Sequence, residues 1–255
     1  MAVGAHVPSV SPLEEARERN AEVVQIFLSD PQSWKKPAPR ADAEALRDAP
    51  IPVYVHAPYL INVCADNNRV RIPSRRILQE TCDAAGEIDA TAVIVHGGHV
   101  TGDGPQEEGI DRWRKALDSI DTPVPVLIEN TAGGDKAVAR RVDWIGRLFS
   151  EVGGDGVGFV LDTCHLWAGG EPFHEVVPRI MEATGRIDLV QVNDSKDPFD
   201  SRRDRHENLG KGLIPPDELA RVIVEAGAPV VVETPGDVAE QAADIEWVRS
   251  VLRST

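Results

Sequence analysis

The 255-residue sequence has few cysteines and no long apolar run. Its cysteines are Cys64, Cys82 and Cys164, an odd number that includes no CxxC pair. We therefore expect reduced thiols, and neither a disulfide framework nor a zinc site built from cysteines. No apolar stretch approaches the length of about 18 residues that would suggest a membrane-spanning helix. The first twenty residues also lack a basic region followed by an apolar run, so we expect no signal peptide and a cytoplasmic protein.

Short β-branched runs recur at nearly even spacing along the chain, and they are typical of strands buried on both faces of a parallel sheet. These runs begin at Val3, Val23, Pro52, Ala92, Pro125, Val157, Leu189 and Pro229. Amphipathic segments such as SPLEEARERN, ARRVDWIGRLFSEV and PDELARVIVEAG separate them and predict helices. Proline at the first helical position is expected at Pro12 and again at Pro73.

Strands that alternate with helices in this way predict a (β/α)₈ TIM barrel that forms a single domain over residues 1–255. An open, doubly wound sheet is the alternative fold. The sequence contains neither a GxGxxG nor a Walker motif that would favour that alternative.

Positive charge is scarce overall, since the formal net charge is -15. Taken alone, this value argues against binding to nucleic acid, whose phosphates attract cations. The basic residues are nevertheless grouped in segments that we expect at one end of the barrel. The groups are Lys35, Lys36 and Arg40; Arg69, Arg71, Arg75 and Arg76; and Lys196, Arg202, Arg203, Arg205 and Lys211. They are either a phosphate-binding surface or ordinary solvated charges.

Polar residues end six of the predicted strands, and the carboxyl ends of all barrel strands face the same mouth. These residues are His56, His96, Glu129, Asp162, Gln191 and Glu233. All but the glutamine are imidazoles or carboxylates, the ligands that zinc and manganese prefer. Several carboxylates buried together without a cation would be unfavourable. The pattern therefore predicts a metal centre at the mouth.

Two short motifs extend this set. In LDTCH, His165 follows Asp162 by three residues, and in SRRDRHENLGKG, Asp204 and His206 are two residues apart. Side chains two apart in an extended loop point the same way. Together with the strand-end residues, the motifs predict a third metal beside the first two.

Seven segments of the sequence resemble endonuclease IV, the family 2 abasic-site endonucleases of the xylose isomerase-like superfamily. They are HAPYLIN from His56, HGGH from His96, IENTAG from Ile128, LDTCH from Leu161, VNDSK from Val192, DRHENLGKG from Asp204 and VVET from Val231. The resemblance implies a TIM barrel with three zinc ions. It also implies hydrolysis of the DNA backbone 5′ to an abasic site in base excision repair, which leaves a 3′-hydroxyl and a 5′-deoxyribose phosphate.

The resemblance also assigns the ligands of each metal. The first metal would be held by His56 and His96, and Glu129 would bridge it to the second. The remaining ligands are Asp162 and Glu233 for the second metal, and His165, Asp204 and His206 for the third. We expect the bridging Glu129, together with Glu233 beside the nucleophile, to position the attacking hydroxide.

Contacts with double-stranded DNA are implied as well. Tyr59 and Leu60 match residues that enter the DNA stack near the lesion, and Gln32 lies in a second DNA-contacting loop that runs to Trp34. We expect arginines to hold phosphates. Those predicted to do so are Arg69, Arg71 and Arg203. The protein is expected to act as a monomer and not at a membrane.

One position departs from the family pattern, because Gln191 stands where relatives carry a histidine that binds the second metal. A glutamine oxygen is a weaker zinc ligand than an imidazole, so this site is expected to favour manganese. His6 and His99 remain in the neighbourhood, and His99 is either a hydrogen-bonded loop residue or a substitute ligand. Cys164, Trp34 and Trp167 are expected to pack rather than to bind.

Two other functions fit part of the pattern. A sugar isomerase or epimerase on a related barrel also places carboxylates and histidines at strand ends, but it has no need of the third site formed by Asp204 and His206. A weak lesion-binding protein that does not cut DNA is favoured only by Gln191.

Overall fold

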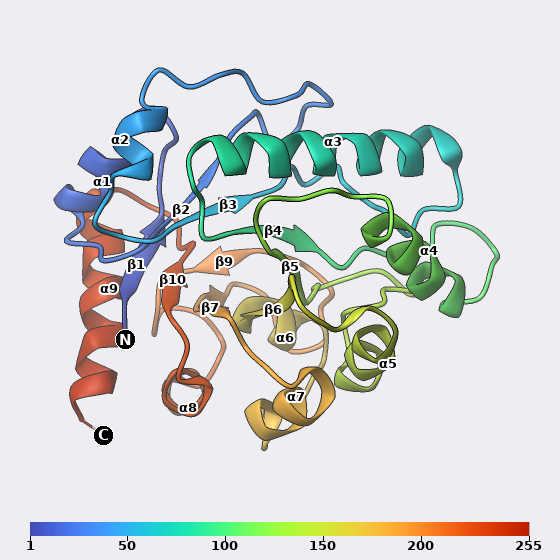
Figure 1. The fold of residues 1–255 in the computed structure, drawn as a ribbon. Coiled ribbons are helices and arrows are strands. Elements are labelled where there is room, and N and C mark those ends of the chain that lie inside the picture. Colours follow the sequence, from blue (N-terminus) through green and yellow to red (C-terminus); the bar gives the residue numbers. More distant parts are fainter. Residues whose placement is uncertain (255) are drawn as a thin grey trace.

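The apolar runs form eight parallel strands that close into a barrel in the computed structural model, which describes residues 1–254 (Figure 1). Around the barrel the order is β1-β10-β7-β6-β5-β4-β3-β2. The strands are β1 (Val3–His6), β2 (Val24–Phe27), β3 (Val53–His56), β4 (Ala92–His96), β5 (Val126–Glu129), β6 (Val157–Asp162), β7 (Leu189–Gln191) and β10 (Val230–Val232). The predicted TIM barrel is thus confirmed, and the open sheet is excluded.

Helices follow the strands and cover the outside of the barrel, with the long α3 lying along one side and α9 close to β1 (Figure 1). They are α1 (Pro12–Glu18), α2 (Ala43–Arg47), α3 (Asn68–Glu87), α4 (Glu107–Leu117), α5 (Val142–Val152), α6 (Thr163–Ala168), α7 (Val176–Thr184), α8 (Pro216–Ala226) and α9 (Val238–Arg253). None of the helices in residues 1–254 has the length and hydrophobicity needed to span a bilayer.

Side chains alternate between the two faces of each strand, and this alternation separates two apolar clusters. The larger cluster joins the outward faces of the strands to the helices. The smaller cluster fills the inside of the barrel with Val23, Tyr54, Ala92, Ile94, Leu127, Val160, Leu189 and Val231. Several of these lie two residues before a polar strand-end residue, as Leu127 does before Glu129. The interior cluster is therefore the floor beneath the polar residues at the mouth.

The long helix begins earlier than predicted. α3 starts at Asn68 rather than at Pro73, because the side chain of Asn67 accepts a hydrogen bond from the Arg69 N–H at 2.9 Å. An asparagine cap of this kind satisfies an otherwise unpaired donor of the first turn. Pro73 lies inside the helix, where the hydroxyl of Ser74 donates to the Val70 carbonyl at 2.8 Å.

Two local features differ from a plain alternation of strands and helices. β10 ends at Val232, so Glu233 lies one residue beyond its strand. After β7 the chain forms a small antiparallel sheet that was not predicted, in which β8 (Asp194–Ser195) pairs with β9 (His206–Glu207). This sheet folds the loop that contains Asp204 and His206 back over the barrel mouth.

Candidate metal centre

Glu129, at the end of β5, is the residue on which the strand-end side chains converge. Its carboxylate is fully buried, with Oε2 at 3.0 Å from His56 Nε2 and Oε1 at 3.4 Å from His96 Nε2. The possible ligand atoms of these three residues all lie within 4.8 Å of one another. The sequence prediction that β3, β4 and β5 bring these side chains together is confirmed.

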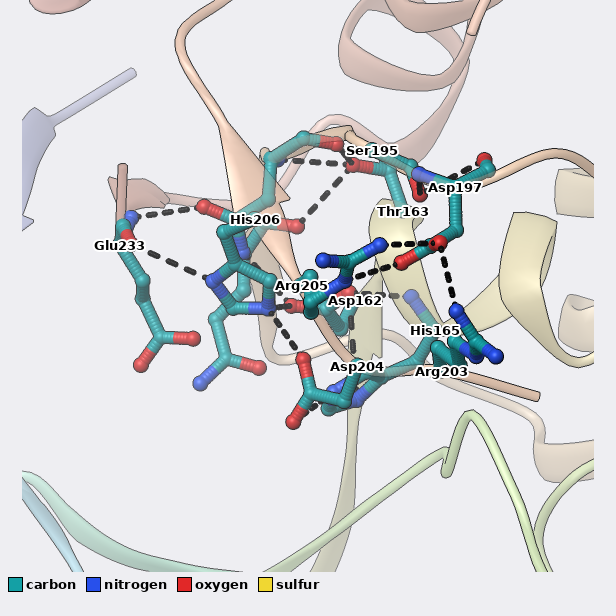
Figure 2. A network of polar contacts seen from close by, with 12 residues as sticks. Asp162, Thr163, His165, Ser195, Asp197, Arg203, Asp204, Arg205, His206 and Glu233 are labelled. Atoms are coloured by element: carbon teal, nitrogen blue, oxygen red, sulfur yellow. Dashed lines mark hydrogen bonds and ion pairs between the residues drawn. The ribbon is translucent and has the colours of Figure 1, made fainter. Parts of the chain in front are cut away.

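A second group forms where α6 meets the loop before β9. The carboxylate of Asp204 contacts two imidazoles, with Oδ2 at 3.1 Å from His165 Nε2 and Oδ1 at 3.0 Å from His206 Nε2 (Figure 2). Asp162 lies beneath them, with its Oδ2 at 3.8 Å from His206 Nε2. The two short sequence motifs therefore meet in space as predicted.

His165 joins the two groups into one centre. Its Nδ1 lies 2.8 Å from Glu129 Oε1 and 2.9 Å from the carbonyl oxygen of Asn130. Glu129 therefore touches three imidazoles, while His165 faces a carboxylate on each side of its ring.

Glu233 lies apart from these groups, and it belongs to none of the compact ligand sets found among residues 1–254. Its Oε1 is 3.2 Å from His6 Nδ1, and it accepts a short hydrogen bond from the side-chain amide of Gln25. Gln191 donates from its own amide to Gln25 Oε1 at 3.1 Å. The predicted strand-end set thus divides into a tight group around Glu129 and a looser one around Glu233.

Sequence reasoning missed several residues that hold these side chains in place. Asn193 donates to Asp162 Oδ2 at 2.7 Å and accepts from the Glu233 N–H at 2.8 Å, so it links two elements of the centre. Asn130 accepts from the Asp162 N–H at 2.7 Å. Both asparagines lie next to or near a strand end, and both stand inside quoted motifs, Asn130 in IENTAG and Asn193 in VNDSK. His6, which was expected near the centre without an assigned role, is the last residue of β1 and contacts Glu233.

The loop that bears Asp204 and His206 is anchored by buried Asp194. The Asp194 carboxylate accepts hydrogen bonds from the backbone N–H groups of Gly210, Gly212 and Ile214 at 2.9–3.0 Å. A Cβ atom on Gly212 would clash with Asp194 Oδ1, so this close approach requires glycine.

Burial opposes the ionisation of the central carboxylates, but their partners reverse its effect at two of them. At Glu129, His96 together with hydrogen bonds from His165 and His56 outweighs burial and holds the pKa well below its usual range. At Glu233, burial is outweighed by His6, so the pKa falls to about 2. Both groups are therefore anions at neutral pH.

The pKa values of two neighbouring groups, Asp162 and His206, are raised instead of lowered. Burial raises the pKa of Asp162 to about 6. Burial disfavours the charged form of His206, but the hydrogen bond to Asp204 outweighs it and raises the pKa to about 9. Protons bound by Asp162 and His206 thus offset the negative charge of the neighbouring carboxylates. A divalent cation at this centre would offset the same charge.

The donor atoms fit a metal. Within residues 1–254, Gln191 Oε1 is buried and has no hydrogen-bond partner, although unpaired buried polar atoms are rare in folded proteins. Three further buried atoms of the centre contact only charged partners, in ion pairs that form when the imidazoles are protonated; they are Glu129 Oε1, His165 Nε2 and His206 Nε2. Carboxylate oxygens and imidazole nitrogens are the usual protein ligands of zinc and manganese.

Cys164 also lies near Asp204 and His206. It is fully buried, and burial raises the pKa of its thiol to about 12, which favours packing over metal binding because the thiolate is the ligand. Trp167 packs against Phe173 and Phe199 and donates to the Asp197 carbonyl at 2.9 Å.

An open cavity of about 320 Å³ lies directly over the centre, with His96, His165 and Asp204 in its wall. Tyr59, which is 52% exposed, forms part of the rim and stacks on His96 with ring centroids 5.9 Å apart. His99 lines the same cavity, and its backbone is held by the side chain of Asn62.

The predicted DNA-contacting residues all follow strand ends, but they differ in solvent exposure and in the contacts that their side chains already make. Gln32 and Arg69 are exposed, and Leu60 is partly exposed. Arg71 donates to the carbonyls of Ala65 and Asp66 at 2.6 and 2.8 Å, so it holds the start of α3. Arg203 is exposed, with an ion pair of 3.7 Å to Asp197.

Comparison with known proteins places this centre in a family. The profile of the xylose isomerase-like TIM barrels matches residues 13–251. The chain is 60% identical over 234 residues to a probable endonuclease 4 of Mycobacterium tuberculosis, covering 92% of this chain and 93% of the relative. It superposes on endonuclease IV from Thermus thermophilus with a TM-score of 0.86, 28% identity and full coverage of both chains.

A D-tagatose 3-epimerase-like protein shares the fold at a TM-score of 0.81 with 19% identity, covering 100% of this chain and 98% of that protein. At this level of identity the likeness concerns the barrel alone, because one fold carries many chemistries. The close sequence relatives, which are endonuclease 4 proteins, distinguish the endonuclease family from the epimerases. The chain belongs to the endonuclease 4 family of xylose isomerase-like TIM barrels.

Proposed function

We propose that this protein is a metal-dependent endonuclease that hydrolyses the DNA phosphodiester bond 5′ to an abasic site, leaving a 3′-hydroxyl and a 5′-deoxyribose phosphate. The observation that carries the proposal is the convergence of three imidazoles on the buried carboxylate of Glu129 at the barrel mouth. Base excision repair in the cytoplasm, by a monomer, is the setting that the family suggests.

The centre would hold three metals, of which the first and third are zinc. His56, His96 and Glu129 would bind the first, while Glu129 would also reach the second. Asp162, Gln191 and Glu233 would complete the second site, where the amide oxygen of Gln191 favours manganese. The third site would be formed by the residues around Asp204, namely His165, Asp204 and His206.

Divalent metals at such a centre lower the pKa of a water molecule and neutralise phosphate charge. Glu233 remains ionised because its pKa is about 2, and its carboxylate is oriented by His6 and Gln25. We assign to it the orientation of the attacking water for in-line displacement. Glu129 remains ionised as well, so it would bridge the first and second metals and help to position the attacking hydroxide.

Selectivity for an abasic site would come from the shape of the mouth. An abasic nucleotide lacks stacking and pairing, so turning it out of the helix costs less than turning out an intact one. Tyr59 stands at the rim of the cavity, next to the partly exposed Leu60. These two side chains would fill the gap left in the duplex, with Gln32 on the adjacent loop. Tyr59 N–H donates to the Pro31 carbonyl at 3.0 Å, which couples these two loops.

Phosphates would be held by Arg69 and Arg203, whose guanidinium groups are exposed. Arg71 would contribute its charge while its hydrogen bonds hold the start of α3. Counter-ion release at these sites makes the affinity for DNA fall with increasing salt. A protein with a net charge of -15 can bind in this way because the local distribution of charge decides the contact.

The experiment that tests the proposal uses a duplex with a single tetrahydrofuran abasic analogue, incubated with the metal-loaded protein and with a chelated sample. The analogue has no aldehyde form, so β-elimination cannot cut it and any nick must be hydrolytic. We expect a nick on the 5′ side with a 3′ end that a DNA polymerase extends, and no nick in chelator. Failure of the metal-loaded protein to cut this duplex would contradict the proposal.

A further inference from the structure

Two glutamines meet inside the barrel beside the centre, although their strands are not neighbours. Gln25 lies on β2 and Gln191 ends β7, with β1 and β10 between them in the barrel. Both side chains are fully buried, and Gln191 Nε2 lies 3.1 Å from Gln25 Oε1. They form a direct amide-to-amide contact above the apolar floor.

The direction of this contact is set by Glu233. The NH₂ group of Gln25 faces the Glu233 carboxylate, which accepts its hydrogen bond, and it also lies 2.8 Å from His6 Nδ1. The carbonyl oxygen of Gln25 then faces Gln191 and requires a donor, which is the NH₂ group of Gln191. The orientation of each amide thus follows from one chain of hydrogen bonds that runs from Gln191 through Gln25 to Glu233.

One consequence concerns the other end of Gln191. With its NH₂ group turned to Gln25, its Oε1 is left buried and without a hydrogen-bond partner within residues 1–254. An unpaired buried carbonyl is unfavourable unless another partner is supplied. A cation beside Asp162, which is paired with Gln191 across β6 and β7, would be that partner.

We propose that Gln25 is a positioning residue of the metal centre, which fixes the amide of Gln191 with its oxygen toward the second metal and holds Glu233 beside it. The inference rests on the proposed metal-dependent function. An amide nitrogen cannot serve as a ligand, so a Gln191 side chain that turned over would replace a ligand with a donor. Gln25 prevents this reversal, and the two glutamines act as a unit.

The test is a double-mutant cycle on metal affinity, with Gln25→Met, Gln191→Met and the combined variant compared with the full-length wild type. Methionine keeps the length of the side chain and removes the amide. Zinc and manganese are titrated separately against a chelating dye. We expect each single change to weaken the weakest site by about 10–100-fold, the range found when partners of metal ligands are removed. The combined variant should be no weaker than the worse single variant.

Gln106→Met is the matched control. Gln106 is a partly buried glutamine whose amide donates at 2.7 Å to the Ala137 carbonyl, away from the centre. Its loss should leave metal affinity within about twofold of wild type while removing a comparable hydrogen bond.

The proposal is overturned if Gln25→Met binds both metals as wild type does, or if the effects of the two single changes add in the combined variant. Should Gln25→Met not fold, Gln25→Ala leaves space for water and is scored against the same two outcomes. Cleavage of abasic DNA by wild type is measured in parallel. A protein that shows the coupling but does not cut would refute the proposed function and leave this inference standing.

Discussion

The two sides of the polar centre offer different atoms. One side, the imidazole side, presents His56, His96, His165 and His206 around Glu129 and Asp204. The other side, the oxygen side, would offer a metal the oxygens of Asp162, Gln191 and Glu233, while the nearby His6 ring contacts Glu233. Nitrogen ligands suit zinc, whereas an all-oxygen set suits manganese or magnesium. The comparison suggests that one chain holds metals of different character a few ångströms apart.

The two sides are also supported differently. On the imidazole side, the carboxylates that bind the rings come from the centre itself, so ligands orient one another. On the oxygen side, amides provide the support, with Asn193 bonded to Asp162 and Gln25 bonded to Glu233. Loss of one residue should therefore disturb more neighbouring ligands on the imidazole side than on the oxygen side.

The largest effect is expected where the two sides join. Glu129→Ala removes the carboxylate that touches three imidazoles, and the rate of cleavage should fall by more than about 10³-fold, or about 4 kcal/mol. Single-turnover cleavage of abasic DNA measures this. Exposed Glu18 on α1 provides the control, and Glu18→Ala should cut normally. Residual activity above a tenth of wild type would mean that Glu129 does not join the two sides.

A smaller loss should be confined to the imidazole side. His206→Ala removes one of the two rings held by Asp204, so the protein should lose one metal per chain and about 100-fold in cleavage rate. Elemental analysis of the purified protein provides the count. The exposed His174 supplies the control variant His174→Ala. An unchanged metal count in His206→Ala would remove the basis for a third site.

A third change concerns the rim above both sides. Tyr59→Ala should weaken binding to abasic duplex by about 10-fold while affecting intact duplex less, because a stacking ring matters only where a nucleotide is displaced. Tyr59→Phe retains the ring and should bind like wild type. Binding is measured by fluorescence anisotropy in chelator, where no cleavage occurs. Equal losses on both duplexes would reduce Tyr59 to a packing partner of His96.

The smallest effect, a few-fold in rate, tests the chemical contrast itself. In wild type, added manganese should raise cleavage more than added zinc, because an all-oxygen ligand set is expected to bind zinc less tightly than manganese. Gln191→His introduces an imidazole there, and it should tighten zinc binding and reduce the stimulation by manganese. Rates are titrated against each metal for both proteins. Superimposable curves would show that Gln191 does not set the choice of metal.

The imidazole side could be predicted from the sequence because the polar residues end strands whose carboxyl ends must meet. His56, His96 and Glu129 needed only the strand spacing, and His165 needed one turn beyond β6. The β8–β9 sheet could not be predicted, since its two strands are two residues each and pair only through long-range contacts.

The oxygen side was harder to predict because it depends on which way amides turn. Gln25 reads as an ordinary polar position in the middle of β2, and its contact with Gln191 arises only when the barrel closes. The start of α3 at Asn68 shows a similar limit, since the cap at Asn67 outweighed the signal from Pro73.

Anomalous diffraction from crystals supplied with zinc and manganese together would show which metal each side of the centre binds. Data collected at the absorption edge of each element identify the metal at each position. We expect zinc beside His56 and His96, and zinc again between His165 and His206. Manganese should lie beside Gln191 on the oxygen side. Zinc at equal strength on both sides, or no metal within reach of Gln191, would rule out this division of the metals.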